Sequence, residues 1–265
     1  MSKLNIESKV KLNNGTQMPL LGFGTYQIPD GEITYNSVLY ALKIGYRHID
    51  TAKFYGNEIS VGGAIRDSGI PRKDIFVTTK LWPNDALNAE KALETSLKKL
   101  DIGYIDLYLI HWPLPGLVKK TWKRLEKIYK NSDTIKAIGV SNHNVNQIKS
   151  ILSIATVKPV VNQVKCSPYN FDPKMYEFCQ KNDIVMEAWG PLTQGKKLSD
   201  ENLTTIAEKY DKSPAQILLR WCIQKGIVTI PKSTHEKRVA ENADIFDFQI
   251  SESDIRKLDN FSKKA

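Results

Sequence analysis

Short apolar segments alternate with amphipathic segments along the whole chain. In the apolar segments nearly every position is hydrophobic, a pattern typical of strands that are buried on both faces of a parallel sheet. Between them, apolar residues recur every three or four positions, as in Ala89, Ala92, Leu93, Leu97 and Leu100, and this spacing predicts helices with one buried face. Eight strands are predicted, at residues 20–24, 46–50, 75–79, 105–110, 135–140, 160–163, 184–188 and 226–230.

Local signals mark the ends of several elements. Ser213, followed by a proline and then by Gln216, predicts a capped helix start. Ser251 predicts the start of a final short helix. Near the amino terminus, an Asn-Asn-Gly turn between residues 10–12 and 18–19 predicts a β-hairpin. We expect this hairpin to close the amino end of a barrel.

The order of the elements predicts the fold. Eight strands that alternate with helices are typical of an α/β protein built as a (β/α)8 TIM barrel, here with an N-terminal β-hairpin. No linker, low-complexity block or internal repeat interrupts the pattern. We therefore expect residues 1–265 to form one domain.

The composition excludes several classes of protein. Of the 265 residues, 41% are hydrophobic and 25% are charged, as in ordinary globular proteins. No window is apolar enough for a signal peptide or a membrane span. The cysteines, Cys166, Cys179 and Cys222, are odd in number and form no CxxC pair, which favours a reducing compartment. We expect a cytoplasmic protein that does not bind membranes.

Charge and histidine spacing narrow the partners further. The net charge of +9 arises from 38 basic and 29 acidic residues, but the lysines are dispersed at helical spacings, so nucleic acid is not an expected partner. A smaller anion, such as a nucleotide phosphate, stays compatible with this charge. The four histidines show neither HxH nor HExxH spacing, and we expect no metal site.

Chemically active residues recur at the ends of successive strands. Lys80 follows Asp50 by 30 positions, and His111 follows Lys80 by 31, which is about one strand-and-helix unit. Tyr55 lies on the loop that leaves the strand of Asp50. The carboxyl ends of barrel strands form the active site in this fold, so these four side chains are expected at one mouth.

Together the four groups suit proton donation to a carbonyl oxygen that receives a hydride at carbon. A phenol has a pKa of about 10, so Tyr55 is protonated at neutral pH. We expect the Lys80 ammonium to lower that pKa and Asp50 to hold Lys80 charged. His111 would donate a hydrogen bond to the carbonyl oxygen. Taken singly, each residue has an ordinary structural explanation in packing, capping or solvation; the argument rests on their conjunction.

Seven motifs in order make the chain resemble the aldo-keto reductase superfamily over its whole length. They are Leu21-Gly-Phe-Gly-Thr-Tyr26, Asp50-Thr-Ala-x-x-Tyr55-Gly-Asn-Glu58, Thr79-Lys-Leu-Trp82, Leu109-Ile-His-Trp-Pro113, Ile138-Gly-Val-Ser-Asn142, Val161-Asn-Gln163, and Ile230-Pro-Lys-Ser233 with Arg238 and Glu241-Asn242. The short prokaryotic members, similar to prostaglandin F synthase or 2,5-diketo-gluconate reductase, are the most alike.

The resemblance implies a function and the residues that perform it. It implies a catalytic tetrad of Asp50, Tyr55, Lys80 and His111, with the tyrosine as general acid, and NADPH as the source of hydride. Ser141, Asn142 and Gln163 would hold the nicotinamide carboxamide, and Trp189 would stack on the ring. The positions it assigns to the cofactor are Thr25, Asp50, Ser141, Asn142, Gln163, Trp189, Pro191, Leu192, Lys232, Ser233, Thr234, Arg238, Glu241 and Asn242.

The phosphate end of this site also follows from the residues themselves. Ser233 or Thr234 is expected to cap the helix that contains Arg238, and a helix amino end beside Lys232 and Arg238 suits an anion. A solvated basic turn is the structural alternative. By the resemblance, Lys232, Ser233 and Arg238 grip the adenosine 2′-phosphate. Glu241 and Asn242 match positions that contact adenine.

Several positions depart from the family pattern or are shorter than in larger relatives. Lys165-Cys166-Ser167 follows Gln163 where an acidic residue and His-Pro are frequent, and Gly190 and Thr193 put the pyrophosphate contacts in doubt. The segments after His111 and after Ser251 are short, so the substrate would meet an aromatic rim of Tyr26, Phe54, Trp82 and Trp112 beside His111. Because apolar pockets discriminate weakly, we expect broad specificity for aldehydes, α-keto compounds and quinones.

The leading hypothesis is therefore a monomeric NADPH-dependent carbonyl reductase of the alcohol dehydrogenase (NADP+) type, with a small-molecule carbonyl substrate. The main alternative is a regulatory or structural barrel of the same family in which the nucleotide binds and turnover is incidental. A metal-dependent barrel hydrolase is a third alternative, which the histidine spacing disfavours. The sequence does not name the physiological carbonyl.

Overall fold

The computed structural model describes residues 4–263; the remaining ends of the predicted domain lie outside the described residues. Eight parallel strands form one sheet in which each strand pairs with the next along the chain. They are β3 (Phe23–Gly24), β4 (His48–Asp50), β5 (Phe76–Leu81), β6 (Leu107–Ile110), β7 (Ile138–Ser141), β8 (Val161–Lys165), β9 (Val185–Trp189) and β10 (Val228–Thr229). A parallel bridge between Leu21 and Thr229 joins the two edge strands, so the sheet closes into the predicted barrel.

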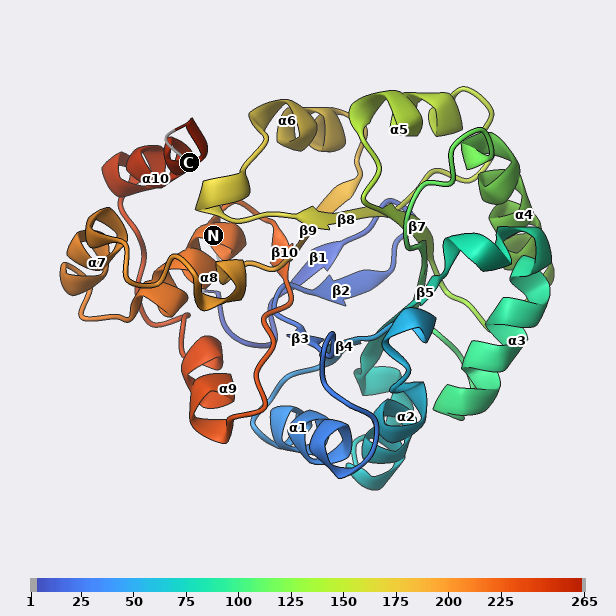
Figure 1. Cartoon of the computed structure of the whole chain (residues 1–265), viewed down its shortest axis with the longest axis horizontal. Helices are drawn as coiled ribbons and strands as arrows, with labels where there is room; N and C mark the ends of the chain where they lie inside the picture. The colour runs from blue at the N-terminus through green and yellow to red at the C-terminus, as the bar shows by residue number, and fades with distance from the viewer. Residues whose placement is uncertain (1–3, 264–265) are drawn as a thin grey trace.

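Helices surround the sheet, as Figure 1 shows. They are α1 (Glu32–Lys43), α2 (Glu58–Asp67), α3 (Ala89–Leu100), α4 (Val118–Asn131), α5 (Val145–Leu152), α6 (Pro173–Lys181), α7 (Glu201–Glu208), α8 (Pro214–Gln224), α9 (Glu236–Ala243) and α10 (Glu252–Asp259). Short 3-10 turns lie between them: η1 (Lys53–Tyr55), η2 (Arg72–Asp74), η3 (Pro83–Asn88), η4 (Pro168–Asn170), η5 (Thr193–Gly195) and η6 (Phe261–Lys263).

The predicted periodicities correspond to buried faces. Strands β5, β6 and β7 are buried at every position, as expected for strands covered on both sides. In α3, four of the five predicted apolar positions are buried, and Leu97 packs partly buried against the core. The predicted capping box of α8 is present, since the Ser213 side chain accepts from Gln216 and the Gln216 side chain returns the bond. Ser251 caps α10.

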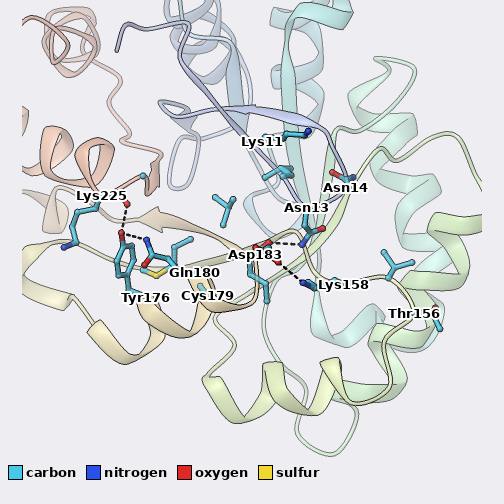
Figure 2. A pocket seen from close by; sticks show the side chains of 16 residues that line it. Lys11, Asn13, Asn14, Thr156, Lys158, Tyr176, Cys179, Gln180, Asp183 and Lys225 are labelled. Carbon is cyan, nitrogen blue, oxygen red and sulfur yellow. Dashed lines mark hydrogen bonds and ion pairs between the residues drawn. The ribbon is translucent and has the colours of Figure 1, made fainter. Parts of the chain in front are cut away.

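The predicted hairpin consists of β1 (Lys9–Lys11) and β2 (Gln17–Pro19), which pair antiparallel. Its loop ties down the amino end of the barrel, because Asn13 Nδ2 donates to the carbonyl oxygens of Pro159 and Asp183, which precede β8 and β9. A hollow of about 740 Å³ lies between this loop and α6 (Figure 2). It is at the end of the barrel opposite the residues that follow the strands.

Candidate active site

Asp50 and Lys80, at the carboxyl ends of β4 and β5, meet inside the barrel. Lys80 Nζ lies 2.7 and 2.8 Å from the two carboxylate oxygens of Asp50 and donates to the Thr51 carbonyl oxygen at 2.8 Å. It also lies 3.2 Å from the Tyr55 hydroxyl. Gln163 Nε2 donates a third hydrogen bond to the Asp50 carboxylate, at 2.8 Å. Three of the four predicted catalytic side chains therefore form one hydrogen-bonded group, and Lys80 is fully buried.

The loop that carries Tyr55 is fixed by its own sequence. Tyr55 ends the turn η1, and Gly56 follows it with φ 74°, a left-handed conformation that glycine adopts without a Cβ clash. The buried Asn57 side chain donates to the carbonyl oxygens of Thr25 and Ile28 and accepts from the Thr51 hydroxyl. These bonds tie the loop to the end of β3, so Tyr55 has little freedom to leave Lys80.

Burial and charge act in opposite directions on the Asp50–Lys80 pair. Burial raises the pKa of Asp50, and the Lys80 ammonium and the Gln163 amide oppose that rise. Burial alone would lower the pKa of Lys80, but Asp50 and then Tyr55 outweigh it, so the pKa of Lys80 is raised. With three N–H donors around the carboxylate, the geometry is that of a charged, hydrogen-bonded pair.

The expected effect of Lys80 on the pKa of Tyr55 is present, but it does not decide the net pKa. Lys80 does lower the pKa of Tyr55, but burial has the larger effect and raises it to about 12. The solvation energy that a phenolate loses inside the barrel is larger than the electrostatic stabilisation it gains from the Lys80 ammonium. Tyr55 is therefore firmly protonated at neutral pH, which leaves it a proton donor.

His111, which follows β6, borders the group of Asp50, Lys80 and Tyr55. Its ring lies edge-on to the Tyr55 ring, with the centroids 5.6 Å apart. Burial, and then the Lys80 ammonium, lower the pKa of His111 to about 3, so the imidazole is neutral. Its Nδ1 is buried and has no hydrogen-bond partner among residues 4–263. A neutral imidazole carries one N–H, which can serve a ligand oxygen.

The residues assigned to the nicotinamide end form a connected patch beside this group. Trp189 Nε1 donates to Asn142 Oδ1 at 2.9 Å, and Asn142 Nδ2 donates to the His111 carbonyl oxygen at 3.0 Å. The Ser141 hydroxyl donates to the Gln163 carbonyl oxygen at 2.9 Å. Asn142 has φ 59°, a conformation uncommon outside glycine that is enriched at functional sites. The patch presents amides and a half-buried indole at the barrel mouth.

Three further predicted cofactor positions surround this patch in different ways. The Thr25 hydroxyl is buried and donates to the Asp50 carbonyl oxygen. In this structure its hydrogen bond therefore stabilises the loop after β4. Pro191 is buried and Leu192 half-buried just after Trp189. At the departures from the family pattern, Gly190 has φ 63° and Thr193 φ 53°. The threonine is the unusual case, because a β-branched residue rarely adopts a left-handed conformation.

The basic segment after β10 does not form the predicted helix cap. Helix α9 begins after His235, two residues beyond Ser233, and no side chain caps it. The Ser233 hydroxyl accepts from the His235 N–H instead, and the Thr234 side chain is exposed. The prediction of a Ser233 or Thr234 cap is therefore wrong, because the turn places both residues ahead of the first helical turn.

Because no side chain caps α9, its amino end can accept a phosphate group. The first N–H groups of α9 have no side-chain acceptor, and such groups at a helix amino end attract anions. Lys232 and Arg238 are exposed next to it, and neither forms an ion pair with any residue in the range 4–263. Two unpaired cations at an uncapped helix end suit an anionic ligand.

Glu241 and Asn242, predicted to contact adenine, lie farther along α9. Glu241 accepts a hydrogen bond from the hydroxyl of Ser213, the N-cap of α8. That bond links the two helices, and Asn242 is buried. The Glu241 carboxylate is thus already hydrogen-bonded to another residue of the protein.

The predicted substrate residues form an aromatic rim around the mouth. Phe54 and Trp82 stack with their ring centroids 4.1 Å apart, and Tyr26 packs on Tyr55 at 5.0 Å. The exposed fractions of Tyr26, Phe54 and Trp112 are 46, 53 and 44%, which is unusual for large hydrophobic side chains. An apolar surface held open beside Tyr55 can receive the body of a small ligand.

Two residues inside the barrel escaped the sequence analysis. His48 and Glu187 are fully buried, and Glu187 Oε1 lies 3.7 Å from His48 Nε2. The available signal was an acidic residue within the apolar strand 184–188. Both side chains point into the barrel because they lie on the same strand face as Asp50 and Trp189, respectively.

Neither a cluster of metal ligands nor a membrane-spanning helix is found in the described part of the chain. Residues 4–263 contain no cluster of three His, Cys, Asp or Glu side chains that could hold a metal ion. Every helix in this range is too short or too polar to cross a bilayer.

Comparison with known proteins places this geometry in a family. The model of the aldo/keto reductase family matches residues 20–263. Glyoxal reductase of Bacillus subtilis strain 168 is 46% identical and covers 98% of this chain and 94% of its own length. The 9,11-endoperoxide prostaglandin H2 reductase of Trypanosoma cruzi is 44% identical, covering 96% of this chain and 91% of its own.

The solved structures agree. The crystal structure of an aldo/keto reductase from Brucella melitensis superposes with a TM-score of 0.91 at 46% identity, over 96% of this chain and 99% of the other. A family match over nearly the whole chain, joined to a closed barrel with Asp50, Tyr55 and Lys80 in contact, leaves one assignment. The chain belongs to the aldo/keto reductase family.

Proposed function

We propose that the protein reduces aldehydes and ketones to alcohols with NADPH and that Tyr55 donates the proton. One observation carries the proposal: a single buried ammonium, on Lys80, is bonded to the Asp50 carboxylate and also lies 3.2 Å from the Tyr55 hydroxyl. Burial of a charged pair of this kind carries a large desolvation penalty, so the pair is weak evidence for a role in stability and favours a role in the reaction. Here the ammonium faces the Tyr55 hydroxyl, which can release a proton to a ligand.

Proton donation follows from the charges around Tyr55. As negative charge grows on a carbonyl oxygen, Tyr55 releases its proton to that oxygen and becomes a phenolate. The Lys80 ammonium stabilises the phenolate, and Asp50 keeps Lys80 charged throughout. Because the pKa of Tyr55 is raised to about 12, the hydroxyl stays protonated until a strongly basic oxygen forms next to it.

His111 supplies orientation rather than a proton. Its pKa, lowered to about 3, keeps the ring neutral over the physiological range. The neutral N–H can donate to the same carbonyl oxygen and fix its direction towards Tyr55, which is electrostatic stabilisation by a preset donor. The edge-on contacts of the ring with Tyr55 and Trp82 hold it in place.

The residues of this chain fit NADPH at both ends. Asn142, Gln163 and Ser141 would hold the carboxamide, with Trp189 against the ring, and Lys232 and Arg238 with the amino end of α9 would hold the 2′-phosphate. When bound, NADPH supplies the hydride for the carbonyl carbon. The uncapped α9 and its two unpaired cations favour NADPH over NADH.

The substrate class follows from the rim and from the relatives. Tyr26, Phe54, Trp82 and Trp112 offer aromatic surface with few hydrogen-bonding groups, which discriminates weakly between carbonyl compounds. The relative named glyoxal reductase agrees with a small carbonyl substrate. We infer a broad specificity that covers aldehydes, α-keto compounds and quinones. The monomeric state and the cytoplasmic location stay predictions.

The test is the oxidation of NADPH by the purified protein with 4-nitrobenzaldehyde, followed by absorbance and with product identified as the alcohol. We expect turnover with NADPH and weaker turnover with NADH. Binding of NADPH without turnover on a panel of aldehydes would instead indicate a regulatory barrel. A panel in which one carbonyl exceeds all others by more than about 10⁴ in kcat/KM would contradict the broad specificity.

A further inference from the structure

Glu187 is placed against the catalytic group by the register of the barrel. It lies opposite Gln163 in the pairing of β8 with β9, and Gln163 donates to Asp50. On its other side is His48, two positions before Asp50 on the same face of β4. The His48 ring sits where Gly22 has no side chain, since a Cβ on Gly22 would lie 2.5 Å from Nδ1.

No residue in the range 4–263 forms a hydrogen bond with the Glu187 carboxyl group. The Glu187 side chain is fully buried. The separation of 3.7 Å from His48 Nε2 is too long for a hydrogen bond. An ionised carboxylate without donors is among the costliest groups to bury, whereas the neutral acid is much less so.

The surrounding charges point in the same direction. Burial, and then the Asp50 carboxylate, raise the pKa of Glu187 to about 8, against the smaller opposing effects of the Gln163 amide and Lys80. Burial, and then Lys80, lower the pKa of His48 to about 3. At neutral pH both side chains are therefore uncharged, and the Lys80 ammonium is balanced by Asp50 alone.

The groups that face Glu187 show what its ionisation would do. β4 contributes His48 and Asp50, β5 contributes Lys80, and the loop of η1 contributes Tyr55; β8 adds only the neutral Gln163, and β10, which pairs with β9, adds no charged group. A charge on Glu187 raises the pKa of Tyr55 and of Lys80 further. Tyr55 would then be a weaker acid.

We propose that Glu187 works as an uncharged acid beside the Asp50–Lys80 pair, a positioning residue whose ionisation weakens proton donation by Tyr55. It touches neither substrate nor cofactor and acts only through its charge state. This inference rests on the proposed function, because it concerns the alkaline limit of carbonyl reduction.

The test compares the pH dependence of kcat for aldehyde reduction in the wild type and in Glu187→Gln, which is permanently neutral and of equal size. The wild-type kcat should fall as the pH rises through about 8. In Glu187→Gln the fall should move up by about one pH unit or more, with kcat near neutral pH changed by less than about tenfold. Coincident profiles for the two proteins would overturn the proposal.

Glu126→Gln is the matched control. Glu126 is also a buried glutamate, but it accepts from the backbone of Thr156 and Val157, far from the mouth. Its amide variant keeps an acceptor oxygen there, and its pH profile should follow the wild type.

A second measurement needs neither turnover nor a variant. In protein labelled with ¹³C at the glutamate carboxyl groups, infrared spectra at pH 7 should contain the carbonyl band of a protonated acid, and the band should disappear as the pH rises through about 8. Absence of the band at pH 7 would overturn the proposal even if Glu187→Gln fails to fold. If the wild type shows the band but does not oxidise NADPH with any aldehyde, the proposed function fails and the neutral acid stands.

Discussion

At the scale of single residues, the candidate site depends on an ammonium that would not be buried by itself. Burial works against the charge of Lys80, and the charge persists because Asp50 and Tyr55 lie within hydrogen-bonding distance. The same burial keeps Tyr55 protonated. One environment thus holds a cation and a neutral phenol side by side, which is the condition for a proton donor at neutral pH.

Tyr55→Phe removes only the hydroxyl from this group. We expect kcat for aldehyde reduction to fall by about 10²- to 10⁴-fold, the usual contribution of general acid catalysis, or by more if no water replaces the donor. NADPH affinity, measured by quenching of protein fluorescence, should change little because Tyr55 lies outside the predicted cofactor contacts. A variant with near-normal turnover would contradict the assignment of Tyr55 as the acid.

At the scale of elements, we expect the turn from β10 to α9 to determine which nicotinamide cofactor the protein prefers. Arg238→Ala should weaken NADPH binding by about ten- to a hundredfold, the loss of one charge-assisted contact of about 1.5–3 kcal/mol. NADH binding should be unchanged, because NADH lacks the phosphate. Calorimetric titrations with both cofactors give the comparison, and an equal loss for the two would show that Arg238 does not contact the 2′-phosphate.

A close approach of α2 to α3 gives a second prediction for the elements. A Cβ built on Gly62 would lie 1.8 Å from the carbonyl oxygen of Leu100, whereas one on Gly63 would have its nearest neighbour, the Tyr35 ring, at an ordinary contact distance of 3.6 Å. Gly62→Ala should therefore lower the free energy of unfolding by at least about 1–3 kcal/mol through overpacking. The control, Gly63→Ala, should leave it unchanged or raise it by up to about 1 kcal/mol, as alanine does in helices. Urea denaturation measures both, and equal stability of the two variants would refute the packing argument.

The elements also show where local patterns fall short. The edge strands β3 and β10 are two residues long, although the apolar segments predicted five residues for each. These strands meet where the barrel closes, and there they are joined by the bridge between Leu21 and Thr229 and by a hydrogen bond from the Gly24 N–H to the Pro231 carbonyl oxygen. Paired length there is set by closure, which the hydrophobicity of one segment does not report.

At the scale of the whole molecule, burial of three histidines links stability to pH. Burial lowers the pKa of His48 and His111 to about 3 and of His143 to about 4. The unfolded chain takes up these protons near pH 6.5, so the stabilisation is complete above that pH and is lost as the pH falls towards the folded values. At pH 5, each buried histidine lowers the free energy of unfolding by about 2 kcal/mol relative to its value above pH 6.5.

The free energy of unfolding should accordingly fall between pH 7 and pH 5. His143→Asn, which keeps a donor for the Ser141 carbonyl oxygen, should lose about 2 kcal/mol less over this range than the wild type. The exposed His235, changed to Asn in the same way, is the control and should follow the wild type. Denaturant titrations at the two pH values decide; equal losses in all three proteins would contradict the role of the buried histidines.

The sequence by itself determined the order of strands and helices, the hairpin, the caps of α8 and α10, and the gathering of Asp50, Tyr55, Lys80 and His111 at one mouth. These follow from local rules, since side chains repeat every two residues in strands and every 3.6 in helices, and parallel strands end at the same side. The family resemblance added the cofactor and its contacts, which no periodicity contains.

Only the tertiary structure decided which atoms meet and how burial changes their chemistry. The bond from Gln163 to Asp50 joins residues 113 positions apart, and the bond from Ser213 to Glu241 engages a residue expected to face adenine. The raised pKa of Tyr55 and the isolated Glu187 carboxyl likewise depend on closure of the barrel around them. Loss of solvation is a property of the space that all eight strands enclose, so no single segment of the chain encodes it.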